Sequence, residues 1–226
     1  MMKQHLHEEL EQLKKSIALM GGRIEEAIQN AVTALVDRDA SLAAEVIAGD
    51  QDIDMLELDI EKRCLNILAT QQPFAADLRF ITAVLRINHD MERMGDLAAN
   101  IAREARRIAG LNIVYMPLNL DEMISEVRKM VRESLKALLE RDTKLAREIC
   151  RQDDIVDSLD SETSTKLIEI MKNSPENIEA ATQLLLAVRH LERIADMATN
   201  IAEEVVFMVE GHNIKHHYKD KGDVEK

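Results

Sequence analysis

The chain is poor in the residues that sheets, tight turns and disulfide frameworks require. Its 226 residues include 7 Gly, 3 Pro, 2 Cys and no Trp, and aromatic residues make up 2% of the total. Few Gly and Pro mean few turns and therefore long elements, and a shortage of aromatic residues disfavours sheets. The apolar residues are mainly Leu, Ile, Ala and 12 Met, which favour helices. The composition therefore predicts an all-α fold.

Several functional classes lack their sequence signatures. No glycine-rich phosphate loop and no GxSxG, HExxH or CxxC motif occurs. Asp and Glu number 42 against 29 Lys and Arg, and the net charge of −13 gives no bulk attraction for nucleic acid or an anionic membrane. The N-terminus is polar and no apolar run would span a bilayer. We therefore expect a cytoplasmic protein without nucleic-acid binding or direct membrane insertion, in which Cys64 and Cys150 are buried and unpaired.

One ancestral unit occurs twice in the chain. The segment 35–45 recurs as 138–148, so that Leu35 and Leu138 are equivalent and stand 103 residues apart. Seven of the eleven residues of 92–102 are identical in 192–202, at a spacing of 100. Self-similarity of this kind indicates a repeat architecture. We predict two equivalent units at residues 1–109 and 120–211, joined by a linker at 110–119 and followed by a polar, His-containing tail at 212–226.

Each unit is expected to contain three long helices packed as an antiparallel bundle. Apolar residues in the segment 84–108 recur every three or four positions, which is typical of a bundle seam. Gly21 and Gly22 are expected to kink or break the first helix, whereas Pro73 and Pro175 suit a first helical turn. The predicted fold is all-α, with two tandem, pseudo-symmetric antiparallel three-helix bundles. The six expected helices are 6–36, 41–70, 73–108, 120–140, 143–172 and 175–211.

Four equivalent pairs of carboxylates are the most distinctive chemical feature of the repeat. The two residues of each pair are four positions apart, which places them on one helix face with Cβ atoms about 6 Å apart. Like charges at that spacing repel, and a neighbouring Arg or Lys or a metal ion would relieve the repulsion. Glu57 and Glu61 extend the first row, and Asp160 partly mirrors them in the second copy. The eight paired residues are Asp50, Asp54, Glu92, Asp96, Asp153, Asp157, Glu192 and Asp196.

On chemistry alone, three interpretations of these pairs stay open. They can form a solvated face, pair with arginines such as Arg93 and Arg193, or bind a metal ion. Oxygen-only ligands suit Fe, Mn, Mg, Ca or carboxylate-bound Zn. The chain has no Glu-xx-His motif of a carboxylate-bridged di-iron bundle, which argues against a metal oxidoreductase. His89 and His190 lie beside the pairs at positions that are not equivalent, so we expect packed or exposed side chains rather than ligands.

Taken together, four strings resemble the PhoU family, the accessory regulators of bacterial phosphate-specific transport. They are QPFAADLR at 72–79, DMERMGDLAANIA at 90–102, HLERIADMATNIA at 190–202 and the C-terminal VVFMVEGHNIKH at 205–216. The resemblance covers essentially the whole chain, including the duplication. The two copies are not equivalent at every position, because Ser164 of the second copy stands where the first copy has Glu61.

The resemblance implies a fold, a role and partners. PhoU proteins are tandem three-helix bundles, cytoplasmic and often dimeric. They are negative regulators of the phosphate-starvation response that modulate phosphate uptake without enzymatic activity. The implied partners are the ATPase subunit of the phosphate ABC transporter, the phosphate sensor histidine kinase and a second copy of the chain. Several members bind multinuclear Fe or Zn clusters through E/DxxxD motifs, which correspond here to the eight paired carboxylates. Other members hold little or no metal, so a metal-free helical adaptor is the alternative.

The expected mechanism is that of an adaptor. Its acidic faces would dock basic surfaces of the kinase or transporter, either directly or through bound cations. Its arginine-bearing faces would pair with a dimer mate or a second partner. These arginines are Arg79, Arg86, Arg93, Arg103 and Arg107.

Overall fold

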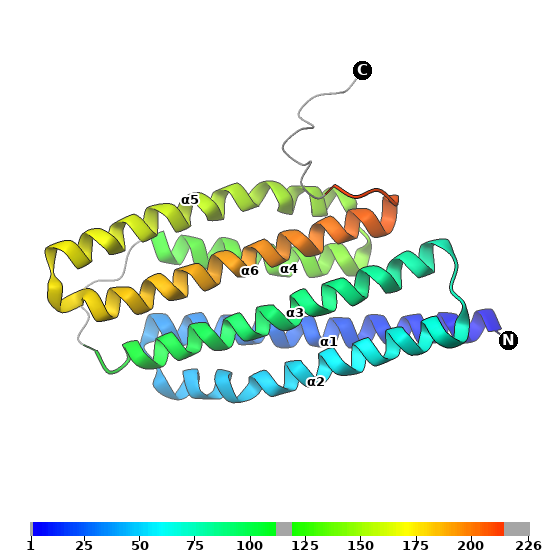
Figure 1. The fold of residues 1–226 in the computed structure, drawn as a ribbon, viewed down its shortest axis with the longest axis horizontal. Coiled ribbons are helices and arrows are strands. Elements are labelled where there is room, and N and C mark those ends of the chain that lie inside the picture. The colour runs from blue at the N-terminus through cyan, green and yellow to red at the C-terminus, as the bar shows by residue number, and fades with distance from the viewer. Residues whose placement is uncertain (1, 112–118, 215–226) are drawn as a thin grey trace, which may run out of the picture.

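Six long helices account for nearly all of the described chain. The computed structural model describes residues 2–111 and 119–214. Helices α1–α3 form one bundle and α4–α6 form the other, and α3 packs along α6 in the middle of the molecule (Figure 1). This confirms the predicted all-α fold of two tandem three-helix bundles. The elements are α1 (Met2–Asp37), α2 (Ala40–Gln71), α3 (Ala75–Ile108), α4 (Asn119–Glu140), α5 (Thr143–Asn173), a 3₁₀ turn η1 (Pro175–Asn177) and α6 (Ile178–Glu210).

Most helix ends agree with the sequence-based prediction within two residues. Of the kink or break expected at Gly21 and Gly22, the break is wrong, and the kink stays a prediction. Helix α1 runs through both glycines. A Cβ atom on Gly21 would lie 3.0 Å from Cδ1 of Leu135, so this glycine allows a close approach of α4 instead of ending α1. Pro73 also differs from its expected place, because α3 begins at Ala75 and the proline belongs to the preceding turn. Most of the expected linker and tail lies outside the described residues.

The same turn starts the second helix of each bundle. Asp39 caps α2 and Asp142 caps α5, and each carboxylate accepts two backbone N–H hydrogen bonds of 2.9–3.1 Å. The preceding residues, Arg38 and Arg141, have φ angles of 58° and 57° in the left-handed region. An Asp cap stabilises a helix by about 1 kcal/mol, which supports this strained turn. The sequence repeat is therefore also a repeat in backbone geometry.

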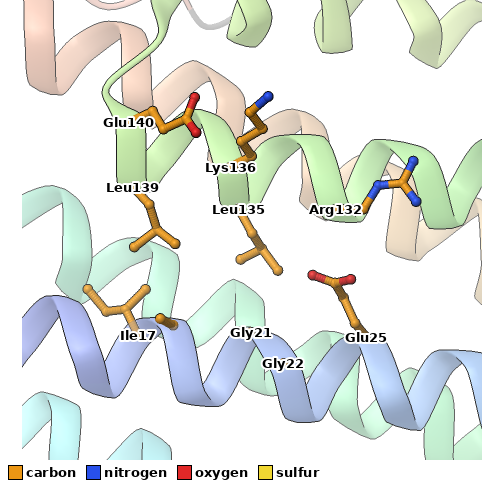
Figure 2. Close-up of a pocket in the computed structure, with 10 residues that line it drawn as sticks. Ile17, Gly21, Gly22, Glu25, Arg132, Leu135, Lys136, Leu139 and Glu140 are labelled. Carbon is orange, nitrogen blue, oxygen red and sulfur yellow. The ribbon is translucent and has the colours of Figure 1, made fainter.

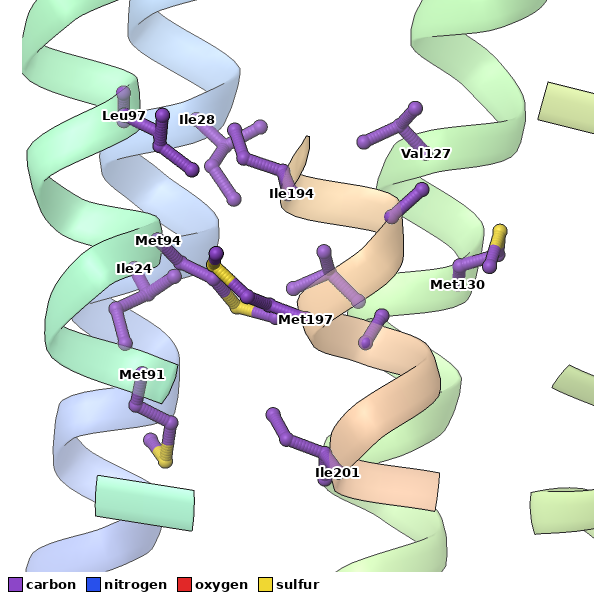
Figure 3. Close-up of a cluster of buried hydrophobic side chains, with 14 of the residues drawn as sticks. Ile24, Ile28, Met91, Met94, Leu97, Val127, Met130, Ile194, Met197 and Ile201 are labelled. Carbon is purple, nitrogen blue, oxygen red and sulfur yellow. The ribbon is translucent and has the colours of Figure 1, made fainter. Parts of the chain in front are cut away.

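One apolar core runs through both bundles. Its centre lies between α3 and α6, where Met94 and Met197 extend toward each other, and Ile24 and Ile28 of α1 close one side (Figure 3). Cys64 and Cys150 are buried and unpaired, as expected, and burial raises the pKa of each thiol to about 12. Buried apolar residues from all six helices form this core, although Met55, Leu58 and Leu65 of α2 are exposed. Among the described helices, none has an apolar stretch of the length that a membrane span requires.

Arginines of α3 contact buried carboxylates and a helix end within the chain. Arg86 Nη1 lies 3.2 Å from both carboxylate oxygens of Glu204, whose side chain is 1% exposed. Arg79 Nε donates to the Met208 carbonyl near the end of α6 at 3.2 Å. Within α3, Arg107 Nη1 lies 2.8 Å from the nearly buried Glu104. A buried carboxylate requires a counter-charge, which Arg86 and Arg107 supply within the chain. Pairing of the α3 arginines with another chain stays a prediction.

The two bundles use different pairs of residues at the same contact between their second and third helices. Gly95 of α3 faces Ile53 of α2, and a Cβ at Gly95 would lie 3.0 Å from Ile53 Cδ1 and 3.1 Å from its Cγ2. The equivalent residues of the second bundle are Ala195 and Val156, both buried. One bundle therefore combines a larger residue with glycine, and the other combines a smaller residue with alanine.

We predict that Gly95→Ala destabilises the protein and that Ile53→Val restores the loss. Crowding in a packed core costs about 1–3 kcal/mol, whereas the gain in helix propensity is about 1 kcal/mol, so a net loss of about 1 kcal/mol is expected. The double variant copies the second bundle and should be more stable than Gly95→Ala alone. Urea unfolding of the wild type, both single variants and the double variant measures the coupling. Additive effects of the two substitutions would contradict this account.

Candidate functional site

The carboxylates predicted from the first copy gather where α2 packs against α3. We call Asp50, Asp54 and Glu57 of α2, with Glu92 and Asp96 of α3, the first acidic face. Burial raises the pKa of Asp50, and the charges of Asp96 and Asp54 raise it further. Burial also raises the pKa of Glu92, and the charges of Asp96, Glu57 and Asp54 add to the effect. The structure thus brings both predicted pairs of this copy together.

The second copy forms an equivalent face between α5 and α6. The second acidic face consists of Asp153, Asp157 and Asp160 of α5, with Glu192 and Asp196 of α6. Burial raises the pKa of Asp153 to about 6, and the charges of Asp157 and Asp196 contribute to this rise. Burial likewise raises the pKa values of Glu192 and Asp196, with the neighbouring carboxylates adding to the effect. All four predicted residues of this copy therefore lie close together as well.

The two faces differ in the cations beside them. Arg103 lowers the pKa of Asp50 and so opposes the effect of burial, whereas the equivalent position in the second copy holds Glu203. In the second face, Arg189 Nη1 lies 2.7 Å from Asp160 Oδ2. The residue equivalent to Arg189 is His89, whose Nδ1 lies 3.9 Å from Glu92. We did not expect a role for Arg189 from the sequence, although the repeat spacing of 100 aligns it with His89 beside the first pair.

Ion pairing leaves most of this negative charge uncompensated. Neither Arg93 nor Arg193 forms an ion pair within 4.0 Å in the described part of the chain, although Arg193 lowers the pKa of Asp196 against the effect of burial. Among the described residues of the two faces, Asp160 pairs with Arg189 and Glu92 lies 3.9 Å from His89 Nδ1. Even in Asp160, Oδ1 is buried without a hydrogen-bond partner. Arginine therefore does not pair with every carboxylate of the two faces among the described residues, and the solvated-face and metal-binding interpretations stay open.

The donor chemistry of both faces suits a hard cation, but the side chains do not converge on one position. Every donor is a carboxylate oxygen, and a cation would offset the burial and repulsion that raise the pKa values. Among residues 2–111 and 119–214, however, no three Asp, Glu, His or Cys side chains are grouped closely enough to hold one ion. Metal binding at these eight residues stays a prediction.

The two histidines near the pairs differ in exposure, and the expectation that neither is a ligand stays a prediction. The side chain of His89 is 65% exposed. His190 of α6 is half-buried, and burial lowers its pKa.

Comparison with known proteins relates both bundles to one domain family. Residues 17–105 and 120–205 each match the PhoU domain. A phosphate-specific transport system accessory protein PhoU homolog from Aquifex aeolicus is 41% identical over 219 residues, which cover 96% of this chain and 99% of that protein. The PhoU homolog of Pseudomonas aeruginosa is 36% identical over 94% of this chain and 88% of its own length.

Two solved structures share the fold. The crystal structure of PhoU from Pseudomonas aeruginosa has a TM-score of 0.88 and 36% identity, over 91% of this chain and 99% of that chain. The phosphate transport system regulatory protein PhoU from Streptococcus pneumoniae has a TM-score of 0.85 and 30% identity, over 95% of this chain and 100% of that chain.

We predict that Asp153→Asn stabilises the metal-free protein at neutral pH. The folded-state pKa of Asp153 is about 6 against an ordinary value of 3.8, so the folded state binds the proton more tightly than the unfolded state. The wild type should therefore lose stability as the pH rises from 3.8 to about 6, and the variant should lack this contribution. Allowing for solvent screening, Asp153→Asn should gain about 1 kcal/mol at pH 7.5.

Urea unfolding of the wild type and Asp153→Asn between about pH 4.5 and pH 7.5 measures the difference in stability. These pH values include most of the range from 3.8 to about 6 in which protonation of Asp153 changes the stability. Glu169→Gln is the matched control, because Glu169 is exposed on the same helix and lies about 24 Å further along it. Parallel stability curves for the wild type and Asp153→Asn would contradict the raised pKa.

Proposed function

Because the chain belongs to the PhoU domain family, we propose that it is a regulatory accessory protein of a phosphate transport system. The observation that carries this proposal is the match of both bundles to the family, together with relatives that are similar over nearly their whole length. These relatives are named as accessory or regulatory proteins, so the proposed role includes no catalytic step. More specifically, the protein acts in the cytoplasm as a negative regulator of the phosphate-starvation response and a modulator of phosphate uptake.

In this proposal the protein works as an adaptor between the transporter and its sensor. The two partners are the ATPase subunit of the phosphate ABC transporter and the phosphate sensor histidine kinase, and the adaptor itself is a homodimer. The two acidic faces support this role, because clustered carboxylates with raised pKa values attract a basic protein surface. Docking such a surface would offset the repulsion that folding leaves within each face.

Metal ions are the second means by which this repulsion could be offset. We propose that Fe or Zn ions bind as carboxylate-bound multinuclear clusters, one at each acidic face. The paired residues of each face would hold the ions, and the positive charge would stabilise the local packing without supporting a reaction. This assignment is supported by Glu92 and Asp196, whose pKa values are raised by burial and by neighbouring carboxylates. A bound cation would offset both effects. The alternative is a metal-free adaptor in which basic partner residues take the place of the ions.

We predict that deleting the gene activates a phosphate-starvation reporter even when phosphate is abundant. The wild-type protein should restore repression, and it should co-purify with the ATPase subunit and the kinase to an extent that depends on phosphate. Asp54→Asn/Asp157→Asn should weaken this association, because it removes one exposed carboxylate from each face. Asp52→Asn/Glu169→Gln removes two exposed carboxylates outside the faces and is the matched control.

Each part of the proposal has its own contradicting result. A reporter that stays repressed in the deletion strain would overturn the role in phosphate regulation. Docking through the acidic faces would be overturned if co-purification with the partners did not depend on phosphate. It would also be overturned if Asp54→Asn/Asp157→Asn and its control co-purified with the partners equally well.

We predict that native protein purified without chelators contains stoichiometric Fe or Zn. The variant Asp96→Ala/Asp196→Ala should lose that metal, because it removes one predicted ligand from each face. Elemental analysis measures the metal, and Asp52→Ala/Glu169→Ala is the control with two exposed carboxylates removed elsewhere. Metal content that is unchanged in Asp96→Ala/Asp196→Ala would rule out these ligands, and absence of metal from the wild type would favour the metal-free adaptor.

A further inference from the structure

Helices α1 and α4 leave a groove between the two bundles. Two adjoining cavities of about 240 Å³ and about 40 Å³ form it, and both are lined by Glu25 and Arg132. Figure 2 shows Leu135 of α4 pointing toward α1 above its two glycines, and Leu139 pointing toward α1 above Ile17. Leu139 is 40% exposed. The groove thus has an apolar floor that is open to solvent.

One of the two glycines in the floor has no packing role within the chain. Gly21 lies against Leu135, as described above, but a Cβ atom on the exposed Gly22 would have no other atom within 4 Å. Glycine inside a helix is less favourable than alanine by about 1 kcal/mol, so Gly22 weakens α1 without a compensating contact in the chain. Its effect is to keep the floor flat enough for another backbone to approach.

The internal repeat shows that the glycines of the groove and its cations Arg132 and Lys136 occur in only one half of the α1–α4 contact. The residues equivalent to Gly21 and Gly22 are Ile124 and Ser125 on α4, at the other end of this contact. The residues equivalent to Arg132 and Lys136 are Gln29 and Thr33 on α1. The mirror half therefore has larger side chains in place of the glycines and neutral side chains in place of Arg132 and Lys136. Arg128 is equivalent to Glu25, and both line the groove.

Three cations follow the α4 wall at intervals of four residues. Arg128, Arg132 and Lys136 are exposed, and none of them forms an ion pair or hydrogen bond with the described residues. Two carboxylates, Glu25 and Glu140, also line the groove. Cations are thus in excess here, in a chain whose net charge is −13.

We propose that this groove binds an amphipathic helix of a partner protein that carries an apolar stripe between acidic flanks. The apolar floor would take the stripe, Gly22 would allow the close approach, and the three unpaired cations would meet the acidic flank. From Ile17 to Ile28 the groove follows α1 for about 17 Å, which corresponds to three helical turns. This inference goes beyond the proposed function, because the groove shares no residue with either acidic face.

Two synthetic peptides test the proposal with the full-length protein. Each is a fluorescent amphipathic helix of about 18 residues with Leu at every third and fourth position, and the flanks are Glu in one peptide and Lys in the other. Fluorescence anisotropy should show one bound Glu peptide per chain, held at least about ten-fold more tightly than the Lys peptide. The affinity for the Glu peptide should fall as salt is added, because exposed cations contribute to it.

Two groove variants and their repeat-equivalent controls locate the binding. Arg132→Glu/Lys136→Glu should weaken binding of the Glu peptide about ten-fold or more, and Gly22→Leu should do the same by filling the floor. Gly22→Leu should not lower the melting temperature, because leucine is a better helix former than glycine. The controls are Gln29→Glu/Thr33→Glu and Ser125→Leu in the mirror half, which should change the affinity less than about two-fold.

The other outcomes would overturn the proposal. No binding of the Glu peptide, or equal affinity for both peptides, would exclude an acidic helix as the occupant. Binding that survives Gly22→Leu would place the peptide elsewhere on the protein. If light scattering instead shows self-association that Gly22→Leu abolishes, the occupant is a second copy of this chain.

Discussion

The close packing of α3 along α6 is the constraint on which the rest of the structure depends. Small buried residues recur along both helices, including Ala98 and Ala102 on α3 and Ala198 and Ala202 on α6, and they allow the helices to approach closely. An apolar seam of this kind tolerates sliding, whereas a buried carboxylate does not. Glu204 of α6 must meet Arg86 of α3, which fixes the register between the bundles. Helices α2 and α5 are thereby held at opposite edges of the molecule (Figure 1), each beside the central helix that completes its acidic face.

Folding brings like charges together at these edges instead of separating them. A chain that needed acidic residues only for solubility would place them apart on exposed surfaces, where repulsion is weak. Here two helices each contribute carboxylates to the same half-buried surface. Burial raises the pKa values of Asp50, Glu92 and Asp153, and the neighbouring carboxylates raise them further. The repulsion lowers the stability of the unbound protein, and any basic group or cation that binds the face recovers that stability. Binding and local stability are thus linked through the same side chains.

Local patterns explain why much of the fold and of the candidate site could be predicted from the sequence. A spacing of four residues places Asp50 beside Asp54 on any helix, and the duplication extends this conclusion to Asp153 and Asp157. Contacts between distant segments could not be predicted in the same way. Gly21 suggests a helix break until Leu135 of the other bundle is seen beside it. Arg86 likewise appears free in sequence, because its partner Glu204 is 118 residues away and is identified only by the packing of α3 on α6.

The differences between the two copies carry more functional information than their similarities. The duplicated backbone and carboxylate pairs would by themselves produce two equivalent faces, which would bind the same partner. Arg103 beside the first face and Arg189 beside the second place positive charge at different points, and Glu203 adds negative charge where the first copy has Arg103. Because electrostatic complementarity selects partners largely through the arrangement of charge, the two faces do not present the same surface. Gly22 and Ser125 distinguish the two ends of the α1–α4 contact in the same way. A pseudo-symmetric scaffold therefore presents surfaces that differ in charge and in shape.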